Sequence, residues 1–246
     1  MVDPVLECSY LSLIEGSPRY ARWLYDAIKP FVKGDILEVG SGVGTYSQFL
    51  YNEFAGTLCL TDINEAYVNK LRRRFPDDRV LHEKLDLGSP EDFKMLRDRK
   101  LLFDTIICMN VLEHVEDDDL ALREMISLLK DGGALILLVP VHKSLYNSID
   151  KAVGHFRRYT KSELVSKLTS TGLRISKIFY FDAFGIVGWY VNGNILKKQA
   201  VNPKAFGFFD KLVPILRFLE DLLPFRITGV SVVAVCVNPV PHGHDK

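Results

Sequence analysis

The sequence has no closely spaced cysteines, no excess of either charge and no long apolar run. Its four cysteines are scattered, at Cys8, Cys59, Cys108 and Cys236. This spacing gives no disulfide framework and is typical of a reducing compartment. No apolar run approaches the roughly 18 residues that a membrane span needs. The first four residues are not a basic start followed by an apolar stretch, so we expect no secretory signal and a cytoplasmic protein.

The charges balance, with 31 lysine and arginine residues against 31 aspartate and glutamate residues. A dedicated nucleic-acid binder normally carries a basic field that meets the phosphates, so we expect no nucleic-acid partner. The length of 246 residues suits one α/β domain with insertions better than two domains. We therefore expect a single domain over residues 17–238 and a flexible tail over 239–246.

Strand-like and helix-like segments alternate along the chain, which predicts a mostly parallel sheet covered by helices on both faces. The run Phe103–Met109 is continuously apolar, as expected at the centre of such a sheet. A serine cap at Ser17 and the proline after it predict the start of a helix. Another helix, between the fourth and fifth strands, is expected over 118–130. The seven expected strands are 35–39, 57–60, 80–85, 103–109, 134–139, 174–181 and 230–237.

Two segments are longer than a simple connection requires. Residues 142–159 show no regular period and are predicted to form a long loop, which in a compact domain is usually functional. Residues 183–228 separate the last two strands and carry apolar side chains at helical spacing, which predicts a helical insert. Its apolar-faced helix over 206–225 is expected to pack as a lid on the sheet, with contact to a membrane surface as the alternative.

A glycine-rich turn follows the first strand, in the run ILEVGSGVGT over residues 36–45. Glycines there let a ligand approach bare backbone, and the helix N-terminus that follows favours an anionic group. A dinucleotide fingerprint needs glycine at its first, third and sixth positions. Those positions are Gly40, Gly42 and Thr45, because the third glycine is displaced to Gly44. The spacing therefore disfavours a nicotinamide cofactor, and a turn without any ligand is the alternative.

A polar residue closes each of the first four strands, namely Glu38, Asp62, Asp86 and Asn110. In an open α/β sheet, ligands bind at the carboxyl edge of the strands, where these residues would lie. Asp62 comes 18 residues after Gly44, close to the spacing at which an acid accepts hydrogen bonds from ribose hydroxyls. We expect it at an exposed strand end. For any one of these four strand-closing residues, a role as a helix cap or as a solvated loop charge is the alternative.

From about residue 17 to residue 237 the chain resembles the class I S-adenosylmethionine-dependent methyltransferases. The segments that carry the resemblance are ILEVGSGVGTYS, LTDIN, LDLGS, FDTIICMNVLEHVEDD and GGALILLVP. It implies a Rossmann-like fold, a seven-stranded sheet with an antiparallel last strand, and S-adenosylmethionine as the cofactor. The cofactor-binding residues that it implies are Glu38, Gly40, Ser41, Gly42, Gly44, Asp62, Ile63, Asp86, Leu87, Asn110 and Val111.

The segment Gly154–Thr160 reads GHFRRYT and resembles a subgroup with a GH[FY]RRY[ST] loop after the fifth strand. That subgroup is associated with glycan and lipid-linked pathways. The loop would lie at the ligand edge, so we expect it to bind the acceptor through Tyr146, Arg157, Arg158 and Tyr159. Arginine suits an acidic or phosphorylated acceptor. A structural loop whose arginines pair with surface carboxylates is the alternative.

The predicted activity is in-line transfer of a methyl group to a small-molecule, glycan or lipid-linked acceptor. A hydroxyl acceptor needs a general base, for which His155 and His114 are the candidates. No metal site is expected, since His242 and His244 lack a third ligand in the sequence. A non-catalytic binding module is the main alternative. A nucleic-acid methyltransferase is less favoured, because residues 110–113 read NVLE where amino-group enzymes carry [DNS]PP[FYW].

Overall fold

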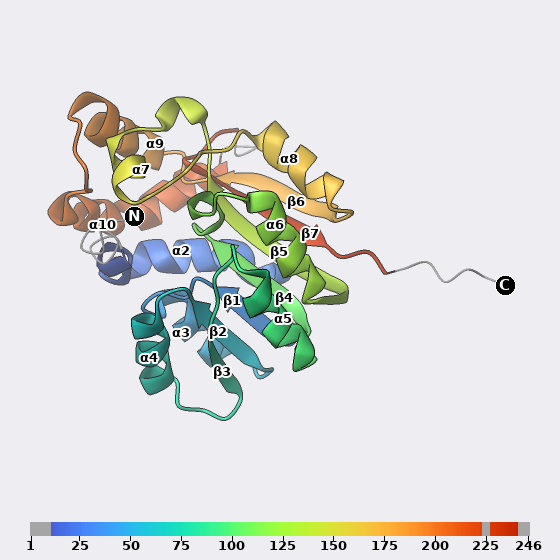
Figure 1. The fold of residues 1–246 in the computed structure, drawn as a ribbon. Helices are drawn as coiled ribbons and strands as arrows, with labels where there is room; N and C mark the ends of the chain where they lie inside the picture. Colours follow the sequence, from blue (N-terminus) through green and yellow to red (C-terminus); the bar gives the residue numbers. More distant parts are fainter. Residues whose placement is uncertain (1–10, 223–226, 241–246) are drawn as a thin grey trace.

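The computed structural model describes residues 11–222 and 227–240 and is built on one seven-stranded sheet (Figure 1). Cys8, His242, His244 and the predicted tail beyond residue 240 lie outside the described residues. The strands are, in sheet order, β3 (Val80–Lys84), β2 (Leu58–Asp62), β1 (Ile36–Val39), β4 (Phe103–Met109), β5 (Leu129–Pro140), β7 (Ser231–Val237) and β6 (Arg174–Phe181).

The sheet is parallel from β3 to β5, and β7 runs antiparallel to both β5 and β6. The strand order reverses between β1 and β4, so the loops after these two strands diverge at the carboxyl edge. This topology confirms the predicted Rossmann-like class I methyltransferase fold, including its antiparallel last strand.

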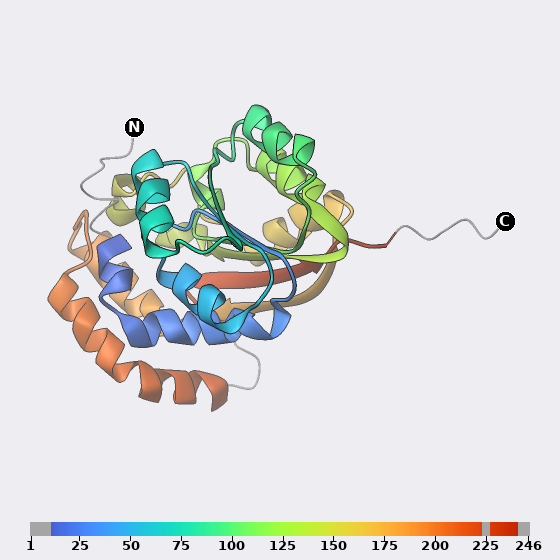
Figure 2. The same ribbon diagram turned by 90° about the horizontal axis from the view of Figure 1, so that it is seen from below.

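Helices cover both faces of the sheet, and β1 shows why. Its Leu37 and Val39 side chains join one buried cluster, while Ile36 joins the other, as the two-residue period of a strand requires. Helices α5 (Pro90–Asp98), α6 (Asp118–Ser127) and α8 (Lys161–Ser170) pack against the first cluster. Helices α2 (Pro18–Ile28), α3 (Thr45–Glu53), α4 (Glu65–Arg74) and α10 (Pro203–Leu222) pack against the second. Figure 2 shows α2 and α10 side by side on that face.

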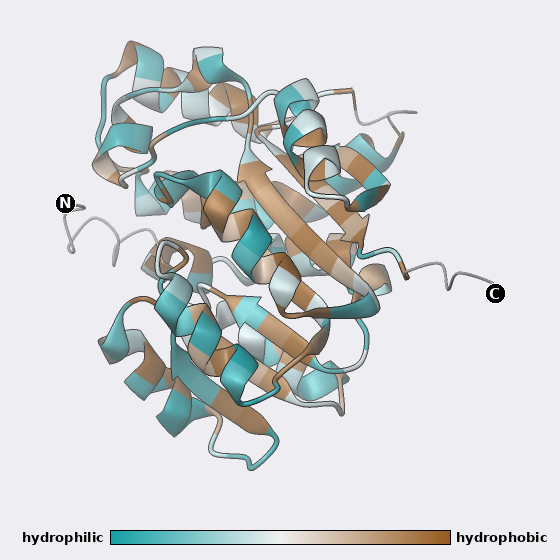
Figure 3. Cartoon of the chain, turned by 45° about the vertical axis from the view of Figure 1, so that its right-hand side comes forward, coloured by the Kyte–Doolittle hydropathy of each residue, from teal (hydrophilic) through white to brown (hydrophobic). Residues whose placement is uncertain are grey.

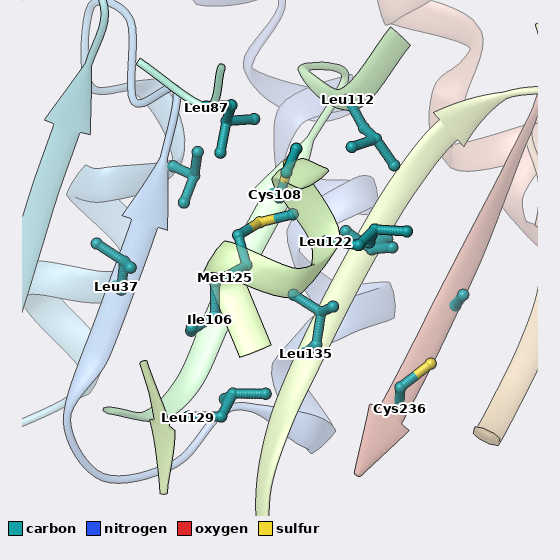
Figure 4. Packing of buried hydrophobic residues seen from close by; sticks show 14 of the residues in the cluster. Leu37, Leu87, Ile106, Cys108, Leu112, Leu122, Met125, Leu129, Leu135 and Cys236 are labelled. Carbon is teal, nitrogen blue, oxygen red and sulfur yellow. The ribbon is translucent and has the colours of Figure 1, made fainter. Parts of the chain in front are cut away.

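The strands at the centre of the sheet are hydrophobic along their length, whereas the helices carry a mixture of residues (Figure 3). Figure 4 shows Ile106 and Leu135 of neighbouring strands beneath Leu122 and Met125 of α6. All four side chains are 0% exposed. Burying one such side chain stabilises the fold by about 1.5–3 kcal/mol, so this layer fixes α6 and the loop that precedes it.

One predicted boundary and one predicted cap are wrong for local reasons, although α2 begins at Pro18 as expected. The expected helix over 118–130 ends at Ser127, because β5 begins at Leu129 and pairs with Phe103. The turn around Gly132, whose φ is +72°, lies inside that strand as an irregularity of the ladder. Ser17 does not cap α2, since its hydroxyl donates to the carbonyl of Leu13.

The segment 142–159 is not the continuous loop that its lack of periodicity predicts. It contains a 3-10 turn at Lys143–Leu145 and the short helix α7 (Ser148–Ala152). Asn147 caps α7 and Asp150 accepts from the Asn147 backbone N–H, which completes a capping box. This box fixes the start of α7.

The helical insert is present, and it consists of α9 (Gly185–Trp189), a π-helical turn at Tyr190–Ile195 and α10. The carboxylate of Glu220 in α10 accepts from the backbone N–H groups of Asp182 and Ala183, which anchors the insert to the end of β6. Residues 223–225 of the predicted 206–225 helix lie outside the described part. Among the described residues, no helix is long and apolar enough to cross a membrane.

Candidate functional site

A cavity of about 900 Å³ lies at the carboxyl edge of the sheet. One end is formed by the loops after β1, β2, β3 and β4, and the other by the segment around α7 and by the insert. The volume is near the upper end of the range for small-molecule sites, about 300–1,000 Å³. The cavity therefore has room for two ligands side by side.

The glycine-rich turn forms the wall next to β1. Gly40 and Gly42 line the cavity with φ angles of +71° and +54°, which side chains with a Cβ rarely adopt. A Cβ at Gly40 would lie 2.4 Å from Val111 Cγ2. Gly44 was expected to touch the ligand, but it does not line the cavity. It precedes α3 at φ +85°, and a Cβ there would meet Leu71 and Phe75 of the core.

Asp62 closes β2 and presents its carboxylate at the cavity, but it is only 7% exposed. The expected exposed position is therefore wrong. Its oxygens accept from the backbone N–H groups of Gly42 (2.9 Å) and Asn64 (2.8 Å). Burial raises the pKa of Asp62 more than these hydrogen bonds lower it. Beside it, the apolar side chain of Ile63 is 56% exposed and lines the cavity.

Glu38 lines the same wall and is almost fully buried. Its carboxylate accepts a hydrogen bond from the Ser47 hydroxyl of α3. Burial raises the pKa of Glu38 to about 7, despite that bond. The other predicted cofactor residues that line the cavity are Ser41, Asp86, Leu87, Asn110 and Val111.

Three ionisable side chains of the cavity wall lie close together. Glu113 and His114 belong to the 3-10 turn after β4, and His155 comes from the loop after α7. The rings of the two histidines are edge to face, 4.7 Å apart between centroids. Burial and then the neighbouring His155 lower the pKa of His114 to about 4, so its ring is neutral at pH 7. Both predicted catalytic residues therefore lie together at the cavity.

A buried aspartate orients His155. Asp150 of α7 is 0% exposed, and its Oδ1 lies 2.8 Å from His155 Nδ1 and 2.8 Å from Arg158 Nε. Its Oδ2 accepts from Trp189 Nε1 of the insert at 3.2 Å. Burial raises the pKa of Asp150, but the His155 hydrogen bond and the Arg158 charge outweigh that effect and lower it below its ordinary value. Asp150 thus joins α7, the GHFRRYT loop and the insert.

Of the four predicted acceptor-binding residues, the structure brings only Arg158 to the cavity. Arg157 points away, pairing with Asp118 of α6 at 3.0 Å and donating to the Glu116 carbonyl. The Tyr159 hydroxyl donates to the same Asp118 and is buried. The Tyr146 hydroxyl donates to the His155 carbonyl and so joins two parts of the 142–159 segment. These three residues hold the loop in place and do not line the cavity.

Three residues at the site are not predicted from the sequence, namely Asp150, Glu113 and Trp189. Asp150 lies in a segment without periodicity, and its partners become neighbours only when α7 folds. The position of Glu113 could have indicated its place at the site, since it directly precedes the candidate base His114 in a turn after a central strand. Trp189 comes from the insert, whose packing no local pattern predicts.

The chain matches the family model described as "Methyltransferase domain" over residues 15–178. Among curated relatives, lovastatin nonaketide synthase of Aspergillus terreus is 29% identical over 154 residues, 57% of this chain and 5% of the synthase. "Probable polyketide synthase 42" of Dictyostelium discoideum is 27% identical over 180 residues, 64% of this chain and 7% of that protein. The matched part is thus a small fraction of these long relatives.

Solved structures share the fold. An S-adenosylmethionine-dependent methyltransferase from Mesorhizobium loti superposes with a TM-score of 0.60 at 15% identity, covering 88% of this chain and 97% of that one. The CurJ carbon methyltransferase gives a TM-score of 0.57 at 15% identity, covering 85% of this chain and 50% of that one. The family match covers more than half of the sequence. The chain therefore belongs to the methyltransferase domain family and has the fold of S-adenosylmethionine-dependent methyltransferases.

Proposed function

We propose that the single domain over residues 17–238 transfers a methyl group from S-adenosylmethionine to a small-molecule or lipid-linked acceptor with an extended apolar part. One observation carries this proposal. A single cavity joins the glycine turn to the Glu113, His114 and His155 side chains and to an apolar wall from the insert. Cofactor and acceptor would therefore meet in one enclosed space.

The residues on the β1–β4 side fit the cofactor. Gly40 lines the cavity in a left-handed conformation that residues with a Cβ rarely adopt, and Asp62 offers carboxylate oxygens for ribose hydroxyls. Ile63 would pack on the adenine, while Asp86 would accept from its amino group. When bound, the cofactor supplies an electrophilic sulfonium methyl group. The chain then has to align the acceptor with that group and exclude water.

The acceptor side is apolar at its outer end. Phe184, Trp189, Phe206 and Leu212 of the insert line it. Phe208 of α10 also lines the cavity, and Ile215 and Phe218 of the same helix are exposed apolar side chains. The polyketide synthases among the relatives also support an acceptor with a hydrocarbon chain. Such a chain would lie along the insert, with the polar group to be methylated at Glu113, His114 and His155.

A label-transfer experiment tests the methyl transfer. The protein is incubated with S-adenosylmethionine carrying an isotopic methyl group and with lipid and water-soluble fractions of source cells. We expect labelled product in the lipid fraction and release of S-adenosylhomocysteine, both measured by mass spectrometry. Cofactor binding without release of S-adenosylhomocysteine in any fraction would instead identify a non-catalytic binding module.

The change Asp62→Asn is expected to weaken S-adenosylmethionine binding about tenfold, or 1.4 kcal/mol. The amide keeps an acceptor for one backbone N–H but loses a charged acceptor for the ribose hydroxyls. Asparagine is preferred to alanine, which would leave two backbone donors unpaired. Calorimetric titration measures the affinity, with Glu65→Gln on the outer face of α4 as the control. Equal affinity in Asp62→Asn and the native protein would place the ribose elsewhere.

The change Arg157→Ala is expected to leave methyl transfer within about twofold of the native rate, or 0.4 kcal/mol in the barrier. The guanidinium binds Asp118, which also accepts from Lys167 and Tyr159 and so stays paired without it. A partly exposed pair of this kind contributes about 0–1 kcal/mol to stability. Steady-state kinetics with the labelled acceptor measures the rate. A loss of tenfold or more would show that Arg157 reaches the acceptor after all.

A further inference from the structure

The Glu113, His114 and His155 side chains each offer one possible ligand atom, and these atoms all lie within 4.8 Å of one another. Glu113 is 0% exposed, and neither carboxylate oxygen has a hydrogen-bond partner among the described residues. An unpaired buried carboxylate costs several kcal/mol unless a cation or a proton compensates it. It faces the cavity, so something that enters the cavity can supply the missing partner.

Both imidazoles are already oriented for such a partner. The Nδ1 of His155 is held by Asp150 at 2.8 Å, which leaves its Nε2 directed to Glu113 Oε1, 3.7 Å away. The His114 ring lies edge to face with that of His155, 4.7 Å apart between centroids, so the two imidazoles are close enough to share a ligand. Ligating histidines in proteins usually donate their second nitrogen to a carboxylate or a carbonyl, because this fixes the ring and the tautomer.

We propose that Glu113, His114 and His155 bind one divalent transition-metal ion in the wall of the cavity. Two imidazoles and one carboxylate form a ligand set that takes zinc, iron, cobalt or manganese, and it leaves further positions of the ion open. All three side chains line the cavity, from which a further ligand could reach the ion. The sequence does not reveal the site, because His155 lies 41 positions after His114 and reaches it only through the packing of α7.

The open positions would take an oxygen of the acceptor, which specifies a hydroxyl-bearing substrate. Binding to the ion lowers the pKa of the hydroxyl. Its proton leaves to solvent, the oxygen forms a bond to the methyl carbon, and the carbon–sulfur bond breaks with its electron pair left on sulfur. His155 then acts as a ligand and not as a general base. This step rests on the proposed methyl transfer, whereas the metal site itself does not.

Metal binding is measured on the full chain after chelation and dialysis, without cofactor or acceptor. Cobalt(II) is titrated and followed by its visible absorption, and zinc(II) is titrated by calorimetry. We expect one ion per chain with micromolar or tighter affinity. Glu113→Gln and His155→Gln should each weaken binding at least about tenfold, or 1.4 kcal/mol. The matched control is His82→Gln, since His82 lies on β3 and does not line the cavity.

His242 and His244, near the end of the sequence, could bind the added metal themselves. The titration is therefore repeated with the double variant His242→Gln/His244→Gln. Thermal unfolding establishes that each variant is folded, and His114→Gln replaces any variant that is not. No bound cobalt, or equal affinity in all ligand variants and the native protein, would overturn the site. A protein that binds the metal but transfers no methyl group would keep the site and refute the proposed function instead.

Discussion

Replacing Asp150 with alanine is expected to lower the free energy of unfolding by about 3–5 kcal/mol, the usual cost of breaking a buried ion pair. Its main partner, Arg158, has a side chain only 1% exposed and would keep its charge without a carboxylate. Among the described residues, the Arg158 guanidinium would keep a hydrogen bond to the Val141 carbonyl and a cation–π contact with the Trp189 ring, 4.7 Å from the centroid. Neither contact compensates a buried charge.

Urea unfolding followed by circular dichroism measures this loss. The matched control is Asp98→Ala, which removes an exposed carboxylate paired with Lys94 one helical turn away. Such a pair contributes about 0.3–0.5 kcal/mol. Asp150→Asn keeps the shape and should fall between the two. A loss below about 1 kcal/mol in Asp150→Ala would mean that Arg158 finds solvent, and that the loop is not held in the way described.

Most of the fold could be predicted because its signals are local. The strands β4 and β6 have the bounds that the sequence predicts, and a polar residue, Asn110 or Asp182, directly follows each of them. The boundary after α6 could not be predicted in this way. A glycine pair usually ends a helix, but at Gly132 and Gly133 it forms an irregularity within a strand that already began at Leu129.

The cofactor half of the candidate site was predictable for the same reason. Its residues directly follow strands whose carboxyl ends meet at one edge, so position in the sequence fixes position in space. Gly44 is the exception, because the same positive φ serves core packing as well as a ligand turn.

The acceptor half was predicted poorly because it depends on the direction of successive side chains in an irregular segment. Arg157 and Arg158 are neighbours, yet one reaches Asp118 on α6 and the other Asp150 on α7. Without a regular period, the sequence cannot tell which arginine faces the cavity. The directions of the two arginines are set by their partners Asp118 and Asp150, and in the sequence both of these look like ordinary helix-terminal aspartates.

The change Gly40→Ala is expected to weaken S-adenosylmethionine binding about a hundredfold, or 2.7 kcal/mol. Alanine at φ +71° costs about 1–2 kcal/mol, so the free protein would leave the left-handed conformation and binding would have to restore it. The new Cβ would also lie 2.4 Å from Val111 Cγ2, which forces Val111 or the turn to move in the wall of the cavity. Calorimetric titration measures the affinity.

The two causes can be separated with a double-mutant cycle. In Gly40→Ala/Val111→Ala the clash is removed while the backbone strain remains, so about 1–2 kcal/mol of the loss should persist and the rest should be recovered. The glycine control is Gly207→Ala on α10, where a Cβ would meet nothing within 4 Å and no positive φ is involved. If Gly40→Ala bound the cofactor as tightly as Gly207→Ala, the turn after β1 would not be the cofactor site.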